Sequence, residues 1–157
     1  NMELNRVSNV TTHFFGLSNE RTDLTFYFYP EGSGNASSVN LSERKDAELI
    51  TCHVERLDDF VKQRQLNVDF IKCDVEGAEL LVLEGAKETI STHHPKIILE
   101  INPTWTHRYS YTPIEIWNYL RKFGYSYTTI NDDGTEKSSG DFETDIACGT
   151  NVLFIQE

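Results

Sequence analysis

The chain has 157 residues, enough for one domain with a hydrophobic core and too few for two. Hydrophobic residues make up 38% of it and aromatic residues 11%, which indicates a globular rather than a disordered chain. Lysine and arginine total 14 against 25 acidic residues, a net charge of −11, and no basic cluster occurs. Nucleic acids and anionic membranes are therefore not expected as partners, because both bind clustered positive charge.

The three cysteines, Cys52, Cys73 and Cys148, are odd in number and widely spaced. A zinc site would need cysteine pairs at short spacing, and a secreted disulfide scaffold would need more cysteines. We therefore predict three buried free thiols in a reducing compartment. No signal peptide and no apolar run long enough to span a bilayer stands out, so we expect a cytoplasmic protein.

The first third of the chain predicts strands. Residues 10–15 are rich in β-formers and stop at Gly16, which predicts a strand followed by a turn. Residues 22–29 alternate between apolar and polar side chains, as do residues 50–54, so each predicts a strand with one buried face. Together they predict an antiparallel hairpin excursion over residues 22–54.

The central third predicts a strand–helix–strand unit. A short helix at residues 57–65 precedes an apolar strand at residues 68–74. A helix over residues 78–90 follows, and Gly85 inside it costs about 1 kcal/mol relative to alanine, which predicts close packing there. Residues 96–101 form the next strand, and such units cross over with a right hand.

The last third adds a helix and two strands. Residues 112–115 form a capping box with proline at the first helical position, and the helix is expected to end at Gly124 in a left-handed conformation. Residues 125–130 predict a strand and residues 131–134 a turn. Residues 151–156 then form a last strand that we expect to be antiparallel to its neighbour.

Acidic residues gather where the predicted parallel strands end. Asp74 closes the first of these strands and Glu100 lies at the end of the second, so we expect the two carboxylates at one edge of the sheet. Glu76 and Glu79 follow at the start of a helix, where the dipole favours negative charge, and Glu79 fits ordinary helix capping. Clustered charge is costly without a partner, so this edge predicts a site for a metal, a cation or a polar substrate.

The lysine and histidine residues are interpreted as either functional or structural. Lys72 lies inside the first of these strands and needs either an acidic partner or a route for its ammonium group to solvent. His107 follows the Glu100 strand on a predicted loop and is a candidate general base. His13 and His53 lie on predicted strands and are interpreted as structural.

The run from Asp69 to Ala86, with residues 95–100 after it, resembles the FkbM family of S-adenosylmethionine-dependent methyltransferases. The resemblance fades after about residue 102; upstream it includes residues 1–5, 9–11, 16–18 and 57–59. It implies a class I methyltransferase-like (Rossmann-like) α/β fold. Such a fold has a seven-stranded, mostly parallel sheet with helices on both faces and an antiparallel last strand.

The resemblance implies an S-adenosylmethionine-dependent O-methyltransferase that acts on a hydroxyl group of a sugar or natural-product acceptor. The cofactor contacts that it implies are Gly16, Leu17, Ser18, Asp74 and Val75. The residues expected to orient or deprotonate the acceptor hydroxyl are Asp74, Glu76, Glu100 and His107. A divalent metal is an optional further cofactor.

The family pattern also contains parts with no counterpart here. It begins with a strand, a glycine-rich turn and a helix, followed by an acidic residue on a second strand. Residues 1–7 instead resemble the last turns of a helix already under way. We therefore expect one N-terminally truncated methyltransferase-like domain over residues 1–157 that is inactive in this form and has exposed sheet edges.

Two other functions stay open. One is a hydrolase that holds magnesium or manganese with Asp74, Glu76 and Glu100. The other is a non-catalytic remnant that pairs with a partner, or with a second copy as a homo-oligomer, through an open sheet edge. For the methyltransferase, a small-molecule acceptor is the expected partner, and the loops at residues 30–48 and 102–111 carry no specificity motif.

Overall fold

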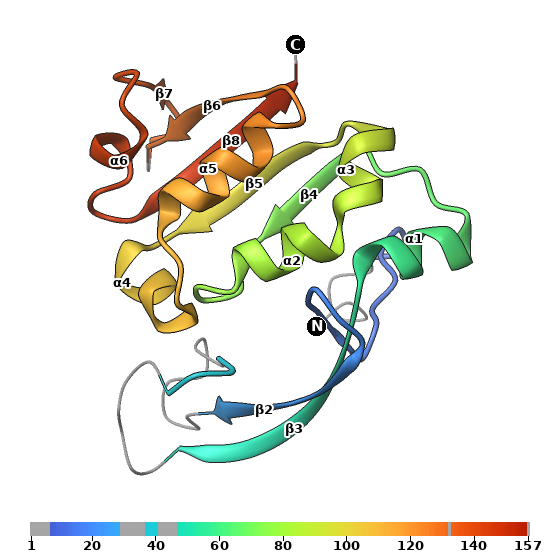
Figure 1. The fold of residues 1–157 in the computed structure, drawn as a ribbon. Coiled ribbons are helices and arrows are strands. Elements are labelled where there is room, and N and C mark those ends of the chain that lie inside the picture. The colour runs from blue at the N-terminus through green and yellow to red at the C-terminus, as the bar shows by residue number, and fades with distance from the viewer. Residues whose placement is uncertain (1–6, 29–36, 41–46, 132, 157) are drawn as a thin grey trace.

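The computed structural model describes residues 7–28, 37–40, 47–131 and 133–156. Of the helix end predicted at residues 1–7, all but Val7 lies outside these ranges, and Val7 is not helical. The strands are β1 (Gly16–Leu17), β2 (Thr22–Phe28), β3 (Glu48–Glu55), β4 (Phe70–Cys73), β5 (Lys96–Ile101), β6 (Tyr125–Ile130), β7 (Glu136–Lys137) and β8 (Thr150–Gln156). The helices are α1 (Leu57–Arg64), α2 (Glu79–Gly85), α3 (Lys87–His93), α4 (Pro103–Thr106), the 3-10 helix η1 (His107–Tyr109), α5 (Pro113–Arg121) and α6 (Phe142–Asp145). The described strands form two sheets rather than one of seven strands, in the orders β1-β3-β2 and β4-β5-β8-β6-β7 (Figure 1).

The smaller sheet contains the two alternating strands that the sequence predicts. β2 and β3 pair antiparallel, and β1 pairs parallel with β3. The strand predicted at residues 10–15 is wrong, because only Gly16 and Leu17 join the sheet. The rings of His13 and Phe15 pack instead against Phe60 of α1, with centroid distances of 4.7 and 5.3 Å.

The larger sheet is mixed. β4 and β5 pair parallel, as predicted for the strand–helix–strand unit. β8 lies antiparallel between β5 and β6, which confirms the antiparallel last strand, and β7 pairs antiparallel with β6. Because β5 and β6 both pair antiparallel with β8, the strands β4, β5 and β6 run in the same direction. The expectation of parallel strands with an antiparallel last strand therefore describes these four strands, and the short β7 makes the sheet more mixed than expected.

The helices α2, α3, α5 and α6 cover one face of the larger sheet and form the main core with it (Figure 1). The sheet contributes side chains such as Ile97, Leu99 and Phe154, which are fully buried. On the opposite face Phe70 is 53% exposed, so β4 is less buried than its apolar sequence predicts. The resemblance implies helices on both faces, whereas the described helices of this core lie on one. None of the described helices is long and apolar enough to cross a membrane.

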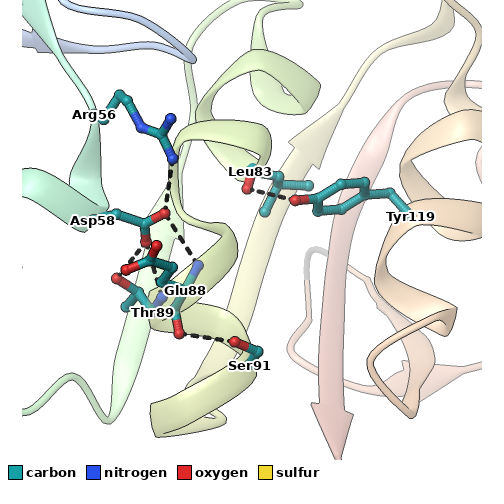
Figure 2. A network of polar contacts seen from close by, with 7 residues as sticks. All are labelled: Arg56, Asp58, Leu83, Glu88, Thr89, Ser91 and Tyr119. Carbon is teal, nitrogen blue, oxygen red and sulfur yellow. Dashed lines mark hydrogen bonds and ion pairs between the residues drawn. The ribbon is translucent and has the colours of Figure 1, made fainter.

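The helix predicted over residues 78–90 is two helices, α2 and α3, and Asp58 of α1 explains the break. Its carboxylate accepts hydrogen bonds from the backbone N–H groups of Glu88 and Thr89 at 3.0 and 2.8 Å (Figure 2). In a continuous helix these groups would donate to carbonyls four residues earlier. Asp58 replaces those carbonyls, so α3 begins as a new helix that is attached to α1.

The helix α5 begins as predicted, and it ends at Arg121, before the predicted end at Gly124. The Glu115 carboxylate accepts a hydrogen bond from the Thr112 backbone N–H at 2.8 Å, as a capping box requires. The turn after α5 ends at Gly124 with a φ of +83°, the left-handed conformation expected there. The short elements α4, η1, β7 and α6 were not expected from the sequence, and α4 and η1 occupy part of the segment predicted as a loop.

Candidate active site

Asp74 and Glu100 lie side by side at the carboxyl edge of the larger sheet. Cys73 of β4 is the Cα partner of Leu99 of β5. The residues that follow them, Asp74 and Glu100, therefore lie at the same edge of the sheet. Burial, the negative charge of Asp74 and a hydrogen bond with it all raise the pKa of the Glu100 carboxyl. The predicted proximity of the two carboxylates is confirmed. Lys72 has the acidic partner it needs, with its Nζ 3.6 Å from Asp74 Oδ2.

Glu76 follows in a strained turn at the same edge. Its φ is +55°, a left-handed conformation that is uncommon for residues other than glycine, and Gly77 continues the turn with a φ of +100°. Glu76 Oε2 is buried and has no hydrogen-bond partner in the described part of the chain. Burial, followed by the charges of Asp74 and Glu100, raises the pKa of Glu76. Strain and an unpaired carboxylate oxygen together favour a functional role for this turn.

The Glu79 side chain holds the turn in place by binding its backbone. It is fully buried, and its Oε1 accepts hydrogen bonds from the backbone N–H groups of Gly77 at 3.0 Å and Val75 at 3.4 Å. The Tyr111 hydroxyl donates to the Gly77 carbonyl at 2.6 Å and lies 3.3 Å from Glu79 Oε2. Glu79 is therefore a buried support of residues 74–77, and more than the ordinary helix cap that the sequence suggests.

The raised pKa values of Glu76, Glu79 and Glu100 predict that the free energy of unfolding rises as the pH falls from 7 toward about 4.5. Between the unfolded and the higher folded pKa, the native state binds more protons than the unfolded chain, so acidification favours it. Urea unfolding at several pH values measures this slope.

The variant Glu100→Gln is expected to be more stable than the parent chain at pH 7 and to show a flatter pH dependence, because it removes one of the repelling carboxylates. Glu143→Gln, at an exposed position, is the control and should leave the slope unchanged. Equal slopes for Glu100→Gln and the parent chain would contradict the crowding of charge at this edge.

His107 and the residues 16–18 are placed differently from the carboxylates. His107 lies in η1 and lines a separate cavity of about 200 Å³ with Thr112 and Glu143. Ser18 is only 5% exposed, and its backbone N–H donates to the Glu55 carbonyl at 2.9 Å. The carboxylates Asp74, Glu76 and Glu100 come together, whereas no contact described here joins His107 to them.

A polar cavity beside Glu100 was missed in the sequence. It has a volume of about 220 Å³ and is lined by Glu100, Ile101, Asn102, Ile130, Cys148, Gly149, Thr150 and Asn151. Asn102 follows the Glu100 strand directly and could have been found from that position. Asn151 could not, because only the antiparallel pairing of β5 with β8 makes it the Cα partner of Glu100.

The cysteines are all free, but they differ in exposure. Cys73 is buried, and burial together with the charge of Glu79 raises its pKa to about 12. Cys148 is exposed and Cys52 half-buried, so the prediction of three buried thiols is wrong for these two. Within the described ranges, no group of three or more His, Cys, Asp or Glu residues is placed to hold a metal ion.

The comparisons with known proteins concern the family and the fold of the chain. The family model described as the methyltransferase FkbM domain matches residues 2–127 of the chain. The chain belongs to the FkbM methyltransferase family. Methyltransferase 1 of Beauveria bassiana (strain ARSEF 2860) is 34% identical over 103 residues, which cover 54% of this chain and 41% of that protein.

The fold of this FkbM family member is similar to that of a solved relative. The crystal structure of methyltransferase FkbM from Methylobacillus flagellatus KT aligns with a TM-score of 0.54 and 22% sequence identity. The alignment covers 98% of this chain and 30% of the other. The chain thus spans less than half the length of either protein, and the similarity to the crystal structure concerns the fold alone.

Proposed function

We propose that the carboxyl edge of β4 and β5 belongs to the active site of an S-adenosylmethionine-dependent O-methyltransferase in a class I-like domain. The observation that carries the proposal is the contact between Asp74 and Glu100, with Glu76 beside them in a strained turn. Membership of the FkbM family supports methyl transfer. The acceptor class proposed is a sugar or another hydroxylated small molecule, in a cytoplasmic protein.

The chemistry of these carboxylates fits the cofactor. S-adenosylmethionine has a sulfonium and an ammonium group, both cationic, and its sulfonium supplies the methyl group when it is bound. Asp74 and Glu76 would hold these charges, and the buried, unpaired Oε2 of Glu76 is an acceptor that a cation would satisfy. Val75, between them, would contact the cofactor mainly through its side chain, because its backbone N–H donates to Glu79 Oε1 and its carbonyl accepts from the Ala78 N–H.

The residues 16–18 fit the cofactor less well. The Ser18 backbone is already bonded to β3 and packs against Gly85 of α2. A side chain at Gly16 would lie 3.1 Å from Val54 Cγ1, so this glycine is close to β3 rather than open to a ligand. Because this segment offers no backbone cradle for a cofactor, we expect weak binding and no turnover from these 157 residues alone.

Glu100 is the residue suited to take the proton of the acceptor hydroxyl. Its raised pKa brings the carboxyl closer to neutral pH, where a general base works best. Bound S-adenosylmethionine would supply the methyl group and keep the electron pair of the broken carbon–sulfur bond, and Glu100 would take the proton of the acceptor hydroxyl as its oxygen is methylated. Asp74 accepts a hydrogen bond from the protonated Glu100 carboxyl and so positions it after it has taken the proton. Positioning of the reacting groups supplies much of the acceleration.

Calorimetric titration with S-adenosylmethionine and S-adenosylhomocysteine tests the cofactor assignment. We expect measurable binding of both, and Asp74→Asn should weaken the binding of S-adenosylmethionine by about tenfold, or 1.4 kcal/mol. Asp59→Asn, which changes an exposed acid on α1, is the matched control. No heat at millimolar ligand, or equal binding by Asp74→Asn and the control, would reject Asp74 as a cofactor contact.

A further inference from the structure

The polar cavity beside Glu100 has the composition of a site for a hydroxylated ligand. Glu100 and Asn151 are directly paired in the β5–β8 ladder, so their side chains lie on the same face of the sheet. Asn102 enters from the start of α4 and Thr150 from the start of β8. Four polar side chains from three elements therefore converge on one space next to the carboxylate proposed as the base.

Hydrogen-bonding capacity in this cavity is largely unused within the described part of the chain. The Asn151 side-chain amide makes no hydrogen bond there. Asn102 uses its Oδ1 to accept from the Thr104 backbone N–H at 3.0 Å, which leaves its Nδ2 group as a donor. The two contacts of Thr150 Oγ1 with carbonyl oxygens are long, 3.4 and 3.5 Å. Amide donors and acceptors of this kind match hydroxyl groups, each of which both donates and accepts.

We propose that this cavity is the acceptor subsite and that it binds a ring with adjacent hydroxyl groups, such as a saccharide unit. Glu100 receives the hydroxyl to be methylated, while Asn151 and Asn102 bind the neighbouring hydroxyls and set which one is presented. The volume of about 220 Å³ is below the roughly 300–1,000 Å³ of sites for drug-sized ligands, so the cavity suits a single ring. This inference rests on the proposed function, because it takes Glu100 as the base.

A second cavity offers the contrasting acceptor chemistry. It lies on the smaller sheet, has a volume of about 460 Å³, and is lined mainly by apolar side chains that include Phe14, Phe26, Phe28, Ile50 and Cys52. It would favour an apolar alcohol. None of the carboxylates Asp74, Glu76 and Glu100 lines it, so an acceptor held there would have no proposed base beside it.

The reactivity of two cysteines can show whether each cavity is occupied, without any methyl transfer, and the third cysteine shows whether the chain is folded. Cys148 is exposed and lines the polar cavity, Cys52 lines the apolar cavity, and buried Cys73, with its pKa raised to about 12, should react only when the chain unfolds. Alkylation of each cysteine by iodoacetamide is followed by peptide mass spectrometry. The probes are a panel of methyl glycosides of hexoses and 6-deoxyhexoses, with cyclohexanol as the apolar alcohol.

We expect at least one glycoside to slow alkylation of Cys148 and to leave Cys52 unchanged. At ten times its Kd the protection should be about tenfold, since only the empty cavity exposes the thiol. Asn151→Leu should abolish the protection, as should Asn102→Ser, which keeps an oxygen to cap α4 but removes the amide donor. Asn118→Leu, a half-buried asparagine on α5 outside the cavity, is the matched control, and an unreactive Cys73 shows that each variant is folded.

Three results would overturn the proposal: no glycoside protects Cys148, cyclohexanol protects it as well as the glycosides do, or protection survives in both asparagine variants. Failure of the subsite is distinguishable from failure of the methyltransferase assignment, because the protection is measured without cofactor. Cofactor binding that depends on Asp74, together with unprotected Cys148, would reject the subsite alone. Protected Cys148 without any cofactor binding would reject the cofactor contacts and leave the subsite in place.

Discussion

The variant Asp58→Ala is expected to lower the free energy of unfolding by about 2–3 kcal/mol, because it removes a helix cap and leaves buried hydrogen-bond donors without an acceptor. Asp58 is 5% exposed and accepts from the backbone N–H groups of Glu88 and Thr89, from Thr89 Oγ1 at 2.9 Å and from Arg56 NH2 at 3.1 Å. Alanine removes the cap of α3 and leaves these donors without their acceptor. Urea unfolding followed by circular dichroism measures the loss.

The adjacent residue supplies the control for this variant. Asp59 has the same side chain on the same helix but is exposed, so Asp59→Ala should change the free energy of unfolding by less than about 0.5 kcal/mol. If the two variants unfold at the same urea concentration, Asp58 does not hold α1 to α3 as the structure indicates.

Gly85→Ala is the second substitution with a large expected effect, a loss of about 2–3 kcal/mol from overpacking. Replacing glycine by alanine in a helix ordinarily stabilises it by roughly 0.5–1 kcal/mol. Here a Cβ atom would lie 2.0 Å from the Ser18 carbonyl oxygen, so the sign is reversed. The Ser18 backbone cannot easily move away, because its N–H is bonded to the Glu55 carbonyl in the smaller sheet. Thermal and urea unfolding both measure the change.

The variant Gly16→Ala is a comparison for Gly85→Ala, because the added Cβ atom meets a milder steric conflict there. A Cβ atom there would lie 3.1 Å from Val54 Cγ1, the end of a side chain that can shift by a few tenths of an ångström. We expect the smaller loss of stability for Gly16→Ala. A chain with Gly85→Ala that is as stable as the parent would show that α2 and the Ser18 segment are not packed as closely as described.

Local patterns in the sequence were sufficient wherever neighbouring residues decide the structure. The alternation of Thr22–Phe28 predicts a strand because side chains two residues apart share a face. The capping box at Thr112 predicts the start of α5, and Gly124 predicts the left-handed residue that closes the turn after it, since both depend on residues within a few positions. The proximity of Asp74 and Glu100 followed from consecutive parallel strands, which end at the same edge of a sheet.

Predictions failed where a distant residue competes with the local pattern. Residues 10–15 have strand-forming side chains but pair with none of the described strands, and the rings of His13 and Phe15 pack on Phe60 instead. The helix at residues 78–90 divides because Asp58, from a separate helix, supplies acceptors to Glu88 and Thr89. Propensity is a weak preference, and a buried carboxylate with several hydrogen bonds outweighs it.

The sequence by itself determined the family, the strand–helix–strand unit and the identity of the carboxylates at its edge, because these depend on a contiguous run of residues. Only the tertiary structure decided that Glu79 is a buried support and that Glu76 has a strained backbone with an unpaired oxygen. It also brought Asn151 opposite Glu100, through an antiparallel pairing of segments 51 positions apart. Strand register between distant segments is set by packing of the whole sheet, and no local pattern specifies it.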